Sequence, residues 1–270
     1  MQSAFDNADR VSLSLDEDGI AQVRLTRANK LNAIDGAMID RLLAVGHALH
    51  QLPGLRAVVL AGEGRAFCSG LDLASFTSEA ALNAEVLAER SYGNANRFQQ
   101  IAMQWRKLPV PVVTAIHGVC FGGGLQIACG ADIRVAAPDA RLAIMEMKWG
   151  IVPDMGGYAL WRGLVRDDVL RELIYTNREF SGQEAQRLGF ATLLDESPLQ
   201  RAKALAAEIA ARSPHAIRAA KRLANESRDL GVDAMLLAES HAQHDLLLSR
   251  NQMEAVKSQV EGRCPDFDDV

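Results

Sequence analysis

Hydrophobic and polar positions alternate in two short segments near the start of the chain, and longer apolar runs follow them. Residues 11–15 and 20–26 each alternate, and the turn-forming residues 16–19 separate them. Alternation with a period of two is typical of a strand with one buried face, so these segments predict a β-hairpin. The run RAVVLA at 56–61 lies between turn signals and is largely apolar, which predicts a strand covered on both faces.

A helical pattern separates these strands. Asp35 is a candidate N-cap for a helix that extends to about residue 52, where a Pro-Gly pair ends it. Further buried strands are expected at 110–116 and 132–136, each separated from the next by a helical or turn segment. Strands that alternate with helices predict an α/β core.

The pattern changes near residue 197. Beyond Leu194 no strand-like run occurs, and the stretch from about 232 to 262 is amphipathic and rich in Leu, Ala and Met. We therefore divide the chain into an α/β core of residues 1–197 and a helical C-terminal region of residues 198–270. The apolar stripe of that region needs a partner surface, which is either the chain's own core or another protomer.

Composition narrows the classes of protein to consider. The chain has 270 residues, of which 49% are hydrophobic and 23% charged, so it can bury a core without disulfides or metals. Its net charge of −5 argues against a nucleic-acid partner. No apolar run approaches the roughly 20 residues that span a bilayer, and the polar N-terminus resembles no targeting signal. We expect a cytoplasmic protein with no membrane or nucleic-acid partner.

Cysteine and histidine spacing gives no strong signature. The four cysteines include no CxxC pair, and free thiols are expected. Cys68 is a possible nucleophile, but no partner signature points to it. His241 and His244 are spaced to share a helix face, yet no third ligand lies nearby, so an ordinary helix surface is expected and we predict no metal site.

Two glycine-rich segments directly follow buried strands: GEGRAFCSGLDL at 62–73 and HGVCFGGGLQ at 117–126. Successive glycines let the backbone approach a ligand closely and direct N–H groups at it. A helix that begins at Gly123 or Gly124 would add the positive end of its dipole. The dinucleotide, phosphate-loop and nucleophile-elbow motifs are all absent from the sequence. A tight turn that only packs a helix on a strand is the alternative.

Several segments together resemble the crotonase, or enoyl-CoA hydratase/isomerase, superfamily, and they cover nearly the whole chain in the right order. They are LTRANKLNAI (25–34), AFCSGLDL (66–73), VPVVTAIHG (110–118), FGGGLQIACGADIRVA (121–136) and TNREFSGQEAQRLGF (176–190). The resemblance implies a spiral of repeated ββα units and a helical C-terminal region that builds homotrimers or dimers of trimers. It also implies an acyl-CoA thioester substrate. CoA would enter as part of that substrate, so no separate cofactor is expected.

The resemblance further implies a shared catalytic device. In the family, two backbone N–H groups, one from each glycine-rich loop, hydrogen-bond the thioester oxygen and stabilise an enolate-like anion. Carried over by position, these donors are Leu71 and Gly123. Ser69, Asp72 and Gly122 flank them and are expected in the substrate site.

Two cations belong to the segment that lies near the CoA nucleotide in the family. Arg27 and Lys30 could each contact its phosphates. A solvated surface charge is the alternative for both residues.

The acidic residues depart from the hydratase pattern. Typical hydratases use two glutamates to hold and activate water, but the first position here is Gln126, and an amide cannot accept a proton. The second position is Glu146. Eight residues later comes Asp154, which resembles the dienoyl-CoA isomerases, although those enzymes also have Asp at the position of Gln126. A dehalogenase branch has a nucleophilic Asp at the position of Asp154, but a Trp at that of Glu146.

We therefore expect Glu146 and Asp154 to be catalytic, with isomerisation of an enoyl- or dienoyl-CoA ahead of hydration. One alternative is hydration by Glu146 alone, with Gln126 only contacting and positioning the water in the substrate site. In another, Asp154 merely caps the helix that begins near Gly156. A third is a non-catalytic acyl-CoA-binding relative.

Overall fold

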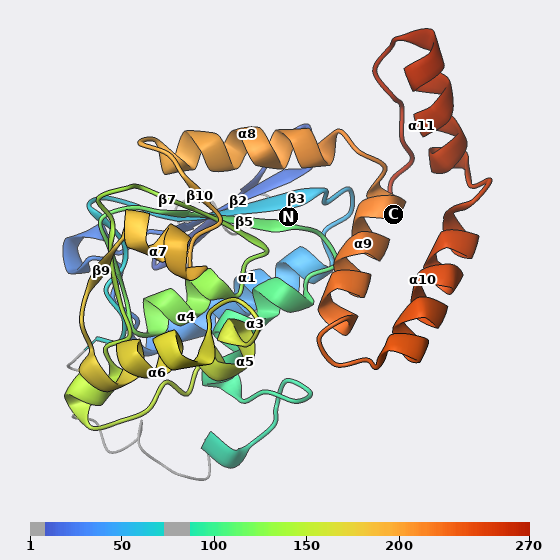
Figure 1. Cartoon of the computed structure of the whole chain (residues 1–270). Helices are drawn as coiled ribbons and strands as arrows, with labels where there is room; N and C mark the ends of the chain where they lie inside the picture. Colours follow the sequence, from blue (N-terminus) through green and yellow to red (C-terminus); the bar gives the residue numbers. More distant parts are fainter. Residues whose placement is uncertain (1–8, 73–86) are drawn as a thin grey trace.

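The structure, a computed structural model, describes residues 9–72 and 87–270, and its strands form two sheets (Figure 1). The larger sheet has the order β1-β2-β3-β5-β7-β10 and the smaller one β4-β6-β8-β9. The strands are β1 (Val11–Leu15), β2 (Ile20–Leu25), β3 (Ala57–Gly62), β4 (Ala66–Cys68), β5 (Val112–Ile116), β6 (Val119–Phe121), β7 (Ile133–Ala136), β8 (Arg141–Ala143), β9 (Phe180–Ser181) and β10 (Leu193–Leu194).

Helices connect the strands and follow the last of them. The α-helices are α1 (Gly36–His50), α3 (Arg97–Lys107), α4 (Gly123–Cys129), α5 (Gly157–Trp161), α6 (Asp167–Thr176), α7 (Gly182–Leu188), α8 (Pro198–Ala210), α9 (Pro214–Glu226), α10 (Val232–Leu246) and α11 (Arg250–Glu261). Two short 3-10 helices, η2 (Ala28–Lys30) and η5 (Glu146–Trp149), precede functional loops.

Successive turns of the chain contribute one strand to each sheet. β3, β5 and β7 are parallel neighbours in the larger sheet. The strands that follow them directly, β4, β6 and β8, are parallel neighbours in the smaller sheet. The chain therefore winds as a spiral of repeated strand–strand–helix units, which confirms the α/β fold class that the sequence predicts.

The sequence-predicted elements are found close to their expected positions. β1 and β2 form the antiparallel hairpin. The carboxylate of Asp35 accepts a hydrogen bond from the N–H of Met38 and so caps α1, as predicted. Every residue of β3 is buried, in agreement with a strand covered on both faces.

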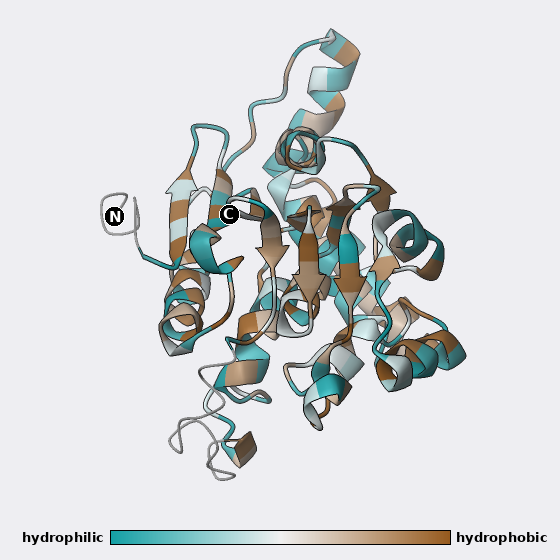
Figure 2. Ribbon diagram, turned by 90° about the vertical axis from the view of Figure 1, so that its left-hand side faces the viewer, coloured by the Kyte–Doolittle hydropathy of each residue, from teal (hydrophilic) through white to brown (hydrophobic). Residues whose placement is uncertain are grey.

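Helix α8 covers one face of the larger sheet, and α1, α3 and α4 lie on the other side (Figure 1). Ala57, Val59 and Ala61 of β3 pack with Ala202 and Ala206 of α8. The intervening residues of β3 belong to the main core. Figure 2 shows hydrophobic residues concentrated in these central strands.

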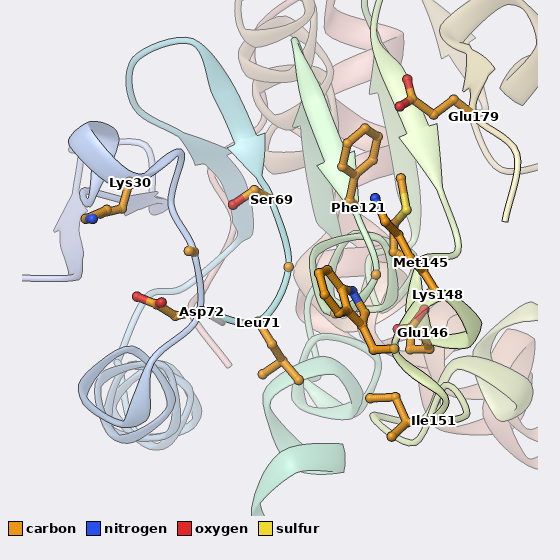
Figure 3. Close-up of a pocket in the computed structure, with 15 residues that line it drawn as sticks. Lys30, Ser69, Leu71, Asp72, Phe121, Met145, Glu146, Lys148, Ile151 and Glu179 are labelled. Carbon is orange, nitrogen blue, oxygen red and sulfur yellow. The ribbon is translucent and has the colours of Figure 1, made fainter. Parts of the chain in front are cut away.

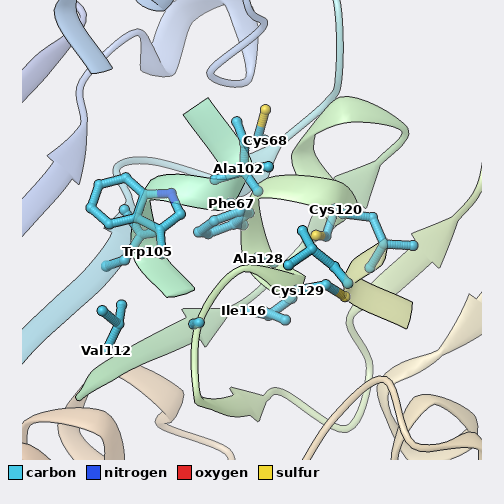
Figure 4. Packing of buried hydrophobic residues seen from close by; sticks show 14 of the residues in the cluster. Phe67, Cys68, Ala102, Trp105, Val112, Ile116, Cys120, Ala128 and Cys129 are labelled. Atoms are coloured by element: carbon cyan, nitrogen blue, oxygen red, sulfur yellow. The ribbon is translucent and has the colours of Figure 1, made fainter. Parts of the chain in front are cut away.

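The main core extends from the larger sheet to the smaller one. Phe67 of β4 and Trp105 of α3 are fully buried in it, together with Cys120 and Cys129 (Figure 4). All seven residues of α4 are buried. The core therefore holds the glycine-rich start of α4 in place.

Within the described residues, the C-terminal part contains helices and no strand, as the sequence predicts. The stretch expected at 232–262 is divided between α10 and α11, because Leu248 adopts a left-handed conformation (φ 63°) and Ser249 then caps α11. Both helices extend from one side of the body (Figure 1). Helix α8 belongs to the predicted C-terminal region, yet it packs on the larger sheet of the core. The division of the chain at residues 197/198 therefore stays a prediction. Among the described helices, none combines the length and the apolar character that a bilayer crossing requires.

One buried lysine attaches α9 to the core. Lys221 is only 7% exposed, and its Nζ donates to the carbonyls of Trp105 (2.9 Å) and Val110 (2.8 Å) and to Asp132 Oδ2 (2.8 Å). Asp132 Oδ2 also accepts from the N–H of Val112, at the start of β5. One ammonium group therefore joins α3, the strand β5 and α9.

We expect Lys221→Met to lower the free energy of unfolding by about 2–4 kcal/mol, because it leaves a partly buried carboxylate and two carbonyls without their donor. Urea denaturation measures this loss. Lys257→Met is the control: Lys257 is 65% exposed, and its loss should cost no more than about 0.5 kcal/mol. Equal losses in the two variants would contradict the anchoring role of Lys221.

Candidate active site

A cavity of about 410 Å³ lies between the two glycine-rich loops and η5 (Figure 3). Seven residues expected in the site line it: Lys30, Ser69, Leu71, Asp72, Gly122, Gly123 and Glu146. The other side chains that line it, which are not assigned to the site in the sequence analysis above, include Phe121, Met145, Lys148, Trp149, Ile151 and Glu179. The cavity thus brings together segments that are up to about 150 residues apart in the chain.

The two glycine-rich loops touch at Gly70. Its φ of +91° lies in the left-handed region, and a Cβ there would come within 2.9 Å of the carbonyl oxygen of Phe121 and 3.7 Å of the Gly123 nitrogen. Any larger side chain would push the loops apart. The alternative suggested by the sequence is a tight turn that only packs a helix on a strand. Such a turn does not account for two loops that touch at the edge of a cavity.

Hydrogen bonds to Ile34 fix the direction of the Leu71 N–H. The N–H of Ile34 donates to the carbonyl of Gly70, and the N–H of Asp72 donates to the carbonyl of Ile34, both at 2.8 Å. Because neighbouring N–H groups of an extended chain point to opposite edges, the Leu71 N–H points away from Ile34.

The Gly123 N–H is also available for a ligand. Gly123 is the first residue of α4, where an N–H has no acceptor inside the helix. Within residues 9–72 and 87–270, neither this N–H nor that of Leu71 donates to a protein group. Both residues line the cavity, so it contains two backbone donors from adjacent loops.

Glu146 lies beside these donors. Its side chain is at the start of η5 and is only 6% exposed. Oε1 accepts a hydrogen bond of 2.6 Å from Gln126 Nε2, whereas the buried Oε2 has no partner among the described residues. A Cβ on Gly122 would be 3.4 Å from Oε1, so the glycine lets the carboxylate lie against the loop.

Gln126 has a different place from the one expected. It is 1% exposed and does not line the cavity. Its Oε1 accepts from the N–H groups of Met155 and Gly157, each at 2.9 Å, while its Nε2 donates to Glu146. Gln126 therefore ties the carboxylate to the start of α5. Protein groups occupy the amide oxygen, and the expected contact of Gln126 with substrate stays a prediction.

Asp154 lies in the turn between η5 and α5, where it is exposed and outside the set of lining residues. The N-cap of α5 is Gly156, and no side chain caps it. The Gln126 oxygen takes the N–H groups at this helix start, so the alternative of Asp154 as a helix cap is not supported.

The protein raises the pKa of both acids. Burial is the main cause that raises the pKa of Glu146, and the negative charge of Asp154 raises it further, while the bond from Gln126 opposes this. The surrounding protein also raises the pKa of Asp154 by displacing water from its carboxyl group. Both carboxyls therefore hold a proton more tightly than they would in water.

The two cations of the N-terminal segment, Arg27 and Lys30, have different surroundings in the structure. Lys30 is exposed and lines the cavity. Arg27 does not line it: Nη1 lies 2.6 Å from Asp72 Oδ2, and Nη2 lies 3.4 Å from Asp35 Oδ2. The expected contact with a nucleotide thus fits the position of Lys30 better than that of Arg27.

The remaining sequence candidates have structural roles. Cys68 is fully buried, and burial raises the pKa of its thiol to about 12, which is unsuitable for a nucleophile. Its Sγ donates to the carbonyl of Asn32. Across the described ranges, no cluster of three or more His, Cys, Asp or Glu side chains could hold a metal ion, and His244 is on an exposed part of α10.

Comparison with known proteins agrees with this arrangement. The sequence model of the enoyl-CoA hydratase/isomerase family matches residues 16–270. The chain belongs to this family, the crotonase superfamily. A probable enoyl-CoA hydratase of Bacillus subtilis is 30% identical over 260 residues, which cover 95% of this chain and 98% of the relative. The peroxisomal Delta(3,5)-Delta(2,4)-dienoyl-CoA isomerase of Arabidopsis thaliana is 30% identical over 266 residues, 93% of each chain.

Solved structures of the family have the same fold. The crystal structure of an enoyl-CoA hydratase from Bacillus anthracis superposes with a TM-score of 0.86 at 26% identity, covering 96% of this chain and 98% of that one. Since crotonase relatives include a hydratase and an isomerase, this member is an enzyme of the lyase or isomerase type.

We expect Glu146→Gln to raise the free energy of unfolding by about 1 kcal/mol at pH 8, because it removes a buried charge with a partnerless oxygen. The folded-state pKa of Glu146 lies above the unfolded value, so ionisation destabilises the native protein as pH rises through that pKa. The difference in the free energy of unfolding between Glu146→Gln and the parent, measured by urea titration, should therefore become smaller at lower pH. It should disappear below the pKa that Glu146 has in the unfolded chain.

The control for this prediction is Glu172→Gln. The Arg178 guanidinium holds the pKa of Glu172 below its usual range, so this second substitution should lower stability at pH 8. A Glu146→Gln protein that is less stable than the parent at pH 8 would show that the buried charge is well compensated.

Proposed function

We propose that this protein moves the double bond of an enoyl- or dienoyl-CoA thioester. One observation carries the proposal: the cavity holds a buried carboxylate with a partnerless oxygen, Glu146 Oε2, beside the two available N–H groups of Leu71 and Gly123. A base and a pair of donors for an oxygen are what removal of a proton next to a carbonyl requires.

The reaction divides into two proton transfers. The thioester oxygen accepts hydrogen bonds from Leu71 and Gly123, and Glu146 takes a proton from the carbon next to the carbonyl. The electron pair of that C–H bond moves toward the thioester oxygen and forms an enolate, which the two N–H groups stabilise. Asp154 lies outside the cavity lining, in the turn that follows η5, so it is the proposed acid for a remote carbon of an acyl chain that extends from the cavity toward this turn. It gives that carbon a proton, and the electrons return to leave a shifted double bond.

No atom is gained or lost in this sequence. Glu146 ends with the proton taken from the substrate, Asp154 has given its own proton to the substrate, and exchange with water restores both acids to their starting states. The charge of Asp154 is one of the causes that raise the pKa of Glu146, after burial.

Gln126 favours isomerisation over hydration. Both lone pairs of its carbonyl oxygen accept backbone N–H groups, so that oxygen has no capacity left for an added water. Water in this cavity would have the single carboxylate of Glu146 to activate it. Hydration by Glu146 alone is the second candidate, and the similarity to the Bacillus subtilis hydratase favours it.

A non-catalytic acyl-CoA-binding relative is less consistent with the site. A buried carboxylate with one oxygen left without a partner costs stability, and binding a thioester through two N–H groups does not need it. For the substrate's nucleotide, exposed Lys30 at the cavity is the proposed phosphate contact.

We also propose that the C-terminal helices associate with further copies of the chain. Several large apolar side chains of this region are exposed, namely Leu236, Leu237, Leu247, Leu248, Met253, Val256 and Val260. Such a surface is unusual for a monomer and is typical of an interface. A trimer or a dimer of trimers would cover it.

The kinetic test uses Glu146→Gln and Asp154→Asn with 2-enoyl-, 3-enoyl- and 3,5-dienoyl-CoA substrates. Glu146→Gln should lower turnover by roughly 10²–10⁴-fold with little change in substrate affinity. Asp154→Asn should abolish transfer to the remote carbon, while exchange of the proton next to the carbonyl with D₂O continues. Rapid hydration of a 2-enoyl-CoA, unchanged in Asp154→Asn, would support hydration instead.

The pH profile tests the pair directly. Because both pKa values are raised, kcat/KM should follow a bell whose two limbs lie above the usual range of free carboxylates. In the proposed reaction the descending limb reports loss of the proton from Asp154, so in Asp154→Asn the exchange of the proton next to the carbonyl with D₂O should keep the ascending limb and lose the descending one. A descending limb that persists in this variant would show that another group is the acid.

A further inference from the structure

Arg27 directs its guanidinium beneath the loop that carries Leu71. The side chain is 14% exposed, and Nη1 donates both to Asp72 Oδ2 (2.6 Å) and to the carbonyl of Ala33 (3.1 Å). Asp35 lies 3.4 Å from Nη2. Two carboxylates therefore balance the charge of this arginine inside the protein.

These contacts join the two segments that orient the Leu71 N–H. Ala33 directly precedes Ile34, and Asp72 directly follows Leu71, while Ile34 and Leu71 are themselves bridged. One guanidinium thus holds a group from each side of this bridge. Without it, the backbone bonds of Ile34 alone would keep Leu71 in place.

Asp35 connects the Arg27 cluster to helix α1 and to Arg10. Its carboxylate caps α1 through the N–H of Met38 and also accepts hydrogen bonds from Arg10 Nε and Nη2. The segment against which Leu71 is aligned is therefore fixed to α1.

We propose that Arg27 is a positioning residue for the Leu71 donor and not a ligand of the CoA phosphates. The inference rests on the proposed function, in which that N–H binds the thioester oxygen. Asp72 and the carbonyl of Ala33 already occupy Arg27 Nη1, and Asp35 faces Nη2, so a phosphate would have to compete with these protein acceptors. Exposed Lys30, at the cavity and on the same segment, is a cation in position for a phosphate.

The test compares an acyl-CoA with the corresponding acyl-pantetheine, which has the same thioester and lacks the nucleotide. Arg27→Gln should lower kcat by between about 10- and 100-fold on both substrates, since a donor displaced by about 1 Å loses that much. KM for the acyl-CoA should change by less than about threefold. Lys30→Gln should show the opposite pattern, with a raised KM for the acyl-CoA alone.

Two further variants separate positioning from loss of fold. Asp72→Asn breaks the Arg27–Asp72 ion pair by changing the acid instead of the arginine. If the two residues act together, the double variant Arg27→Gln/Asp72→Asn should have a kcat no lower than that of Arg27→Gln alone. Arg97→Gln is the matched control, because Arg97 pairs with Asp40 at the surface of α3 and is not among the cavity-lining residues. Melting temperatures identify any variant that fails to fold, and Asp72→Asn then carries the test.

A spectroscopic measurement makes the result independent of the reaction type. A conjugated 2,4-dienoyl-CoA bound to Glu146→Gln should absorb at longer wavelength, because the N–H donors polarise its carbonyl. Adding Arg27→Gln should reduce this shift, and adding Arg97→Gln should not. An undiminished shift, or a kcat loss seen with acyl-CoA but not with acyl-pantetheine, would overturn the proposal. Absence of isomerase turnover with a reduced shift would contradict the proposed function alone.

Discussion

The close approach of two backbone segments, at Gly70 and Phe121, is the constraint on which the site depends. A side chain at residue 70 would meet the Phe121 carbonyl at 2.9 Å, so the loops can touch only through glycine. The same requirement recurs at Gly124, where a Cβ would lie 2.6 Å from the carbonyl of Cys68. Because β4 and β6 are paired just before these points, sheet geometry delivers both loops to one place.

This arrangement separates the task of holding an oxygen from the task of moving a proton. The donors belong to the backbone and are fixed by the sheet, by Ile34 and by the buried helix α4. The proton-transfer groups are side chains on the later segment from η5 to α5. Side chains there can change without disturbing the donors, which fits a family whose relatives include a hydratase and an isomerase.

Local sequence signals predicted the fold well. The alternating hairpin, the cap at Asp35 and the fully apolar β3 depend on neighbours in sequence, and each is found in the structure. The break before α11 could not be predicted, because nothing local marks Leu248 as left-handed.

The site was harder to predict in its connections than in its residues. Glycine-rich loops and the resemblance located the donors and Glu146, since these belong to continuous motifs. The Gln126 bridge joins residues about 30 positions apart, and the Arg27–Asp72 pair joins residues 45 positions apart. The periodicity of hydrophobic residues does not predict contacts between side chains that are so far apart in the sequence. A buried amide within the apolar helix α4 was the one sequence signal for the bridge.

The amide of Gln126 also decides how many protons the site can store. Glutamine and glutamate differ by one base in their codons, so a second carboxyl group is a single mutation away. It would place two carboxyl oxygens about where Gln126 Nε2 and Glu146 Oε1 now lie, 2.6 Å apart, and like charges at that separation must share a proton. The neutral amide leaves Glu146 free to ionise alone. A single substitution at residue 126 could thus change the reaction of this fold, because it would change the number of protons held between residues 126 and 146 while the backbone stays the same.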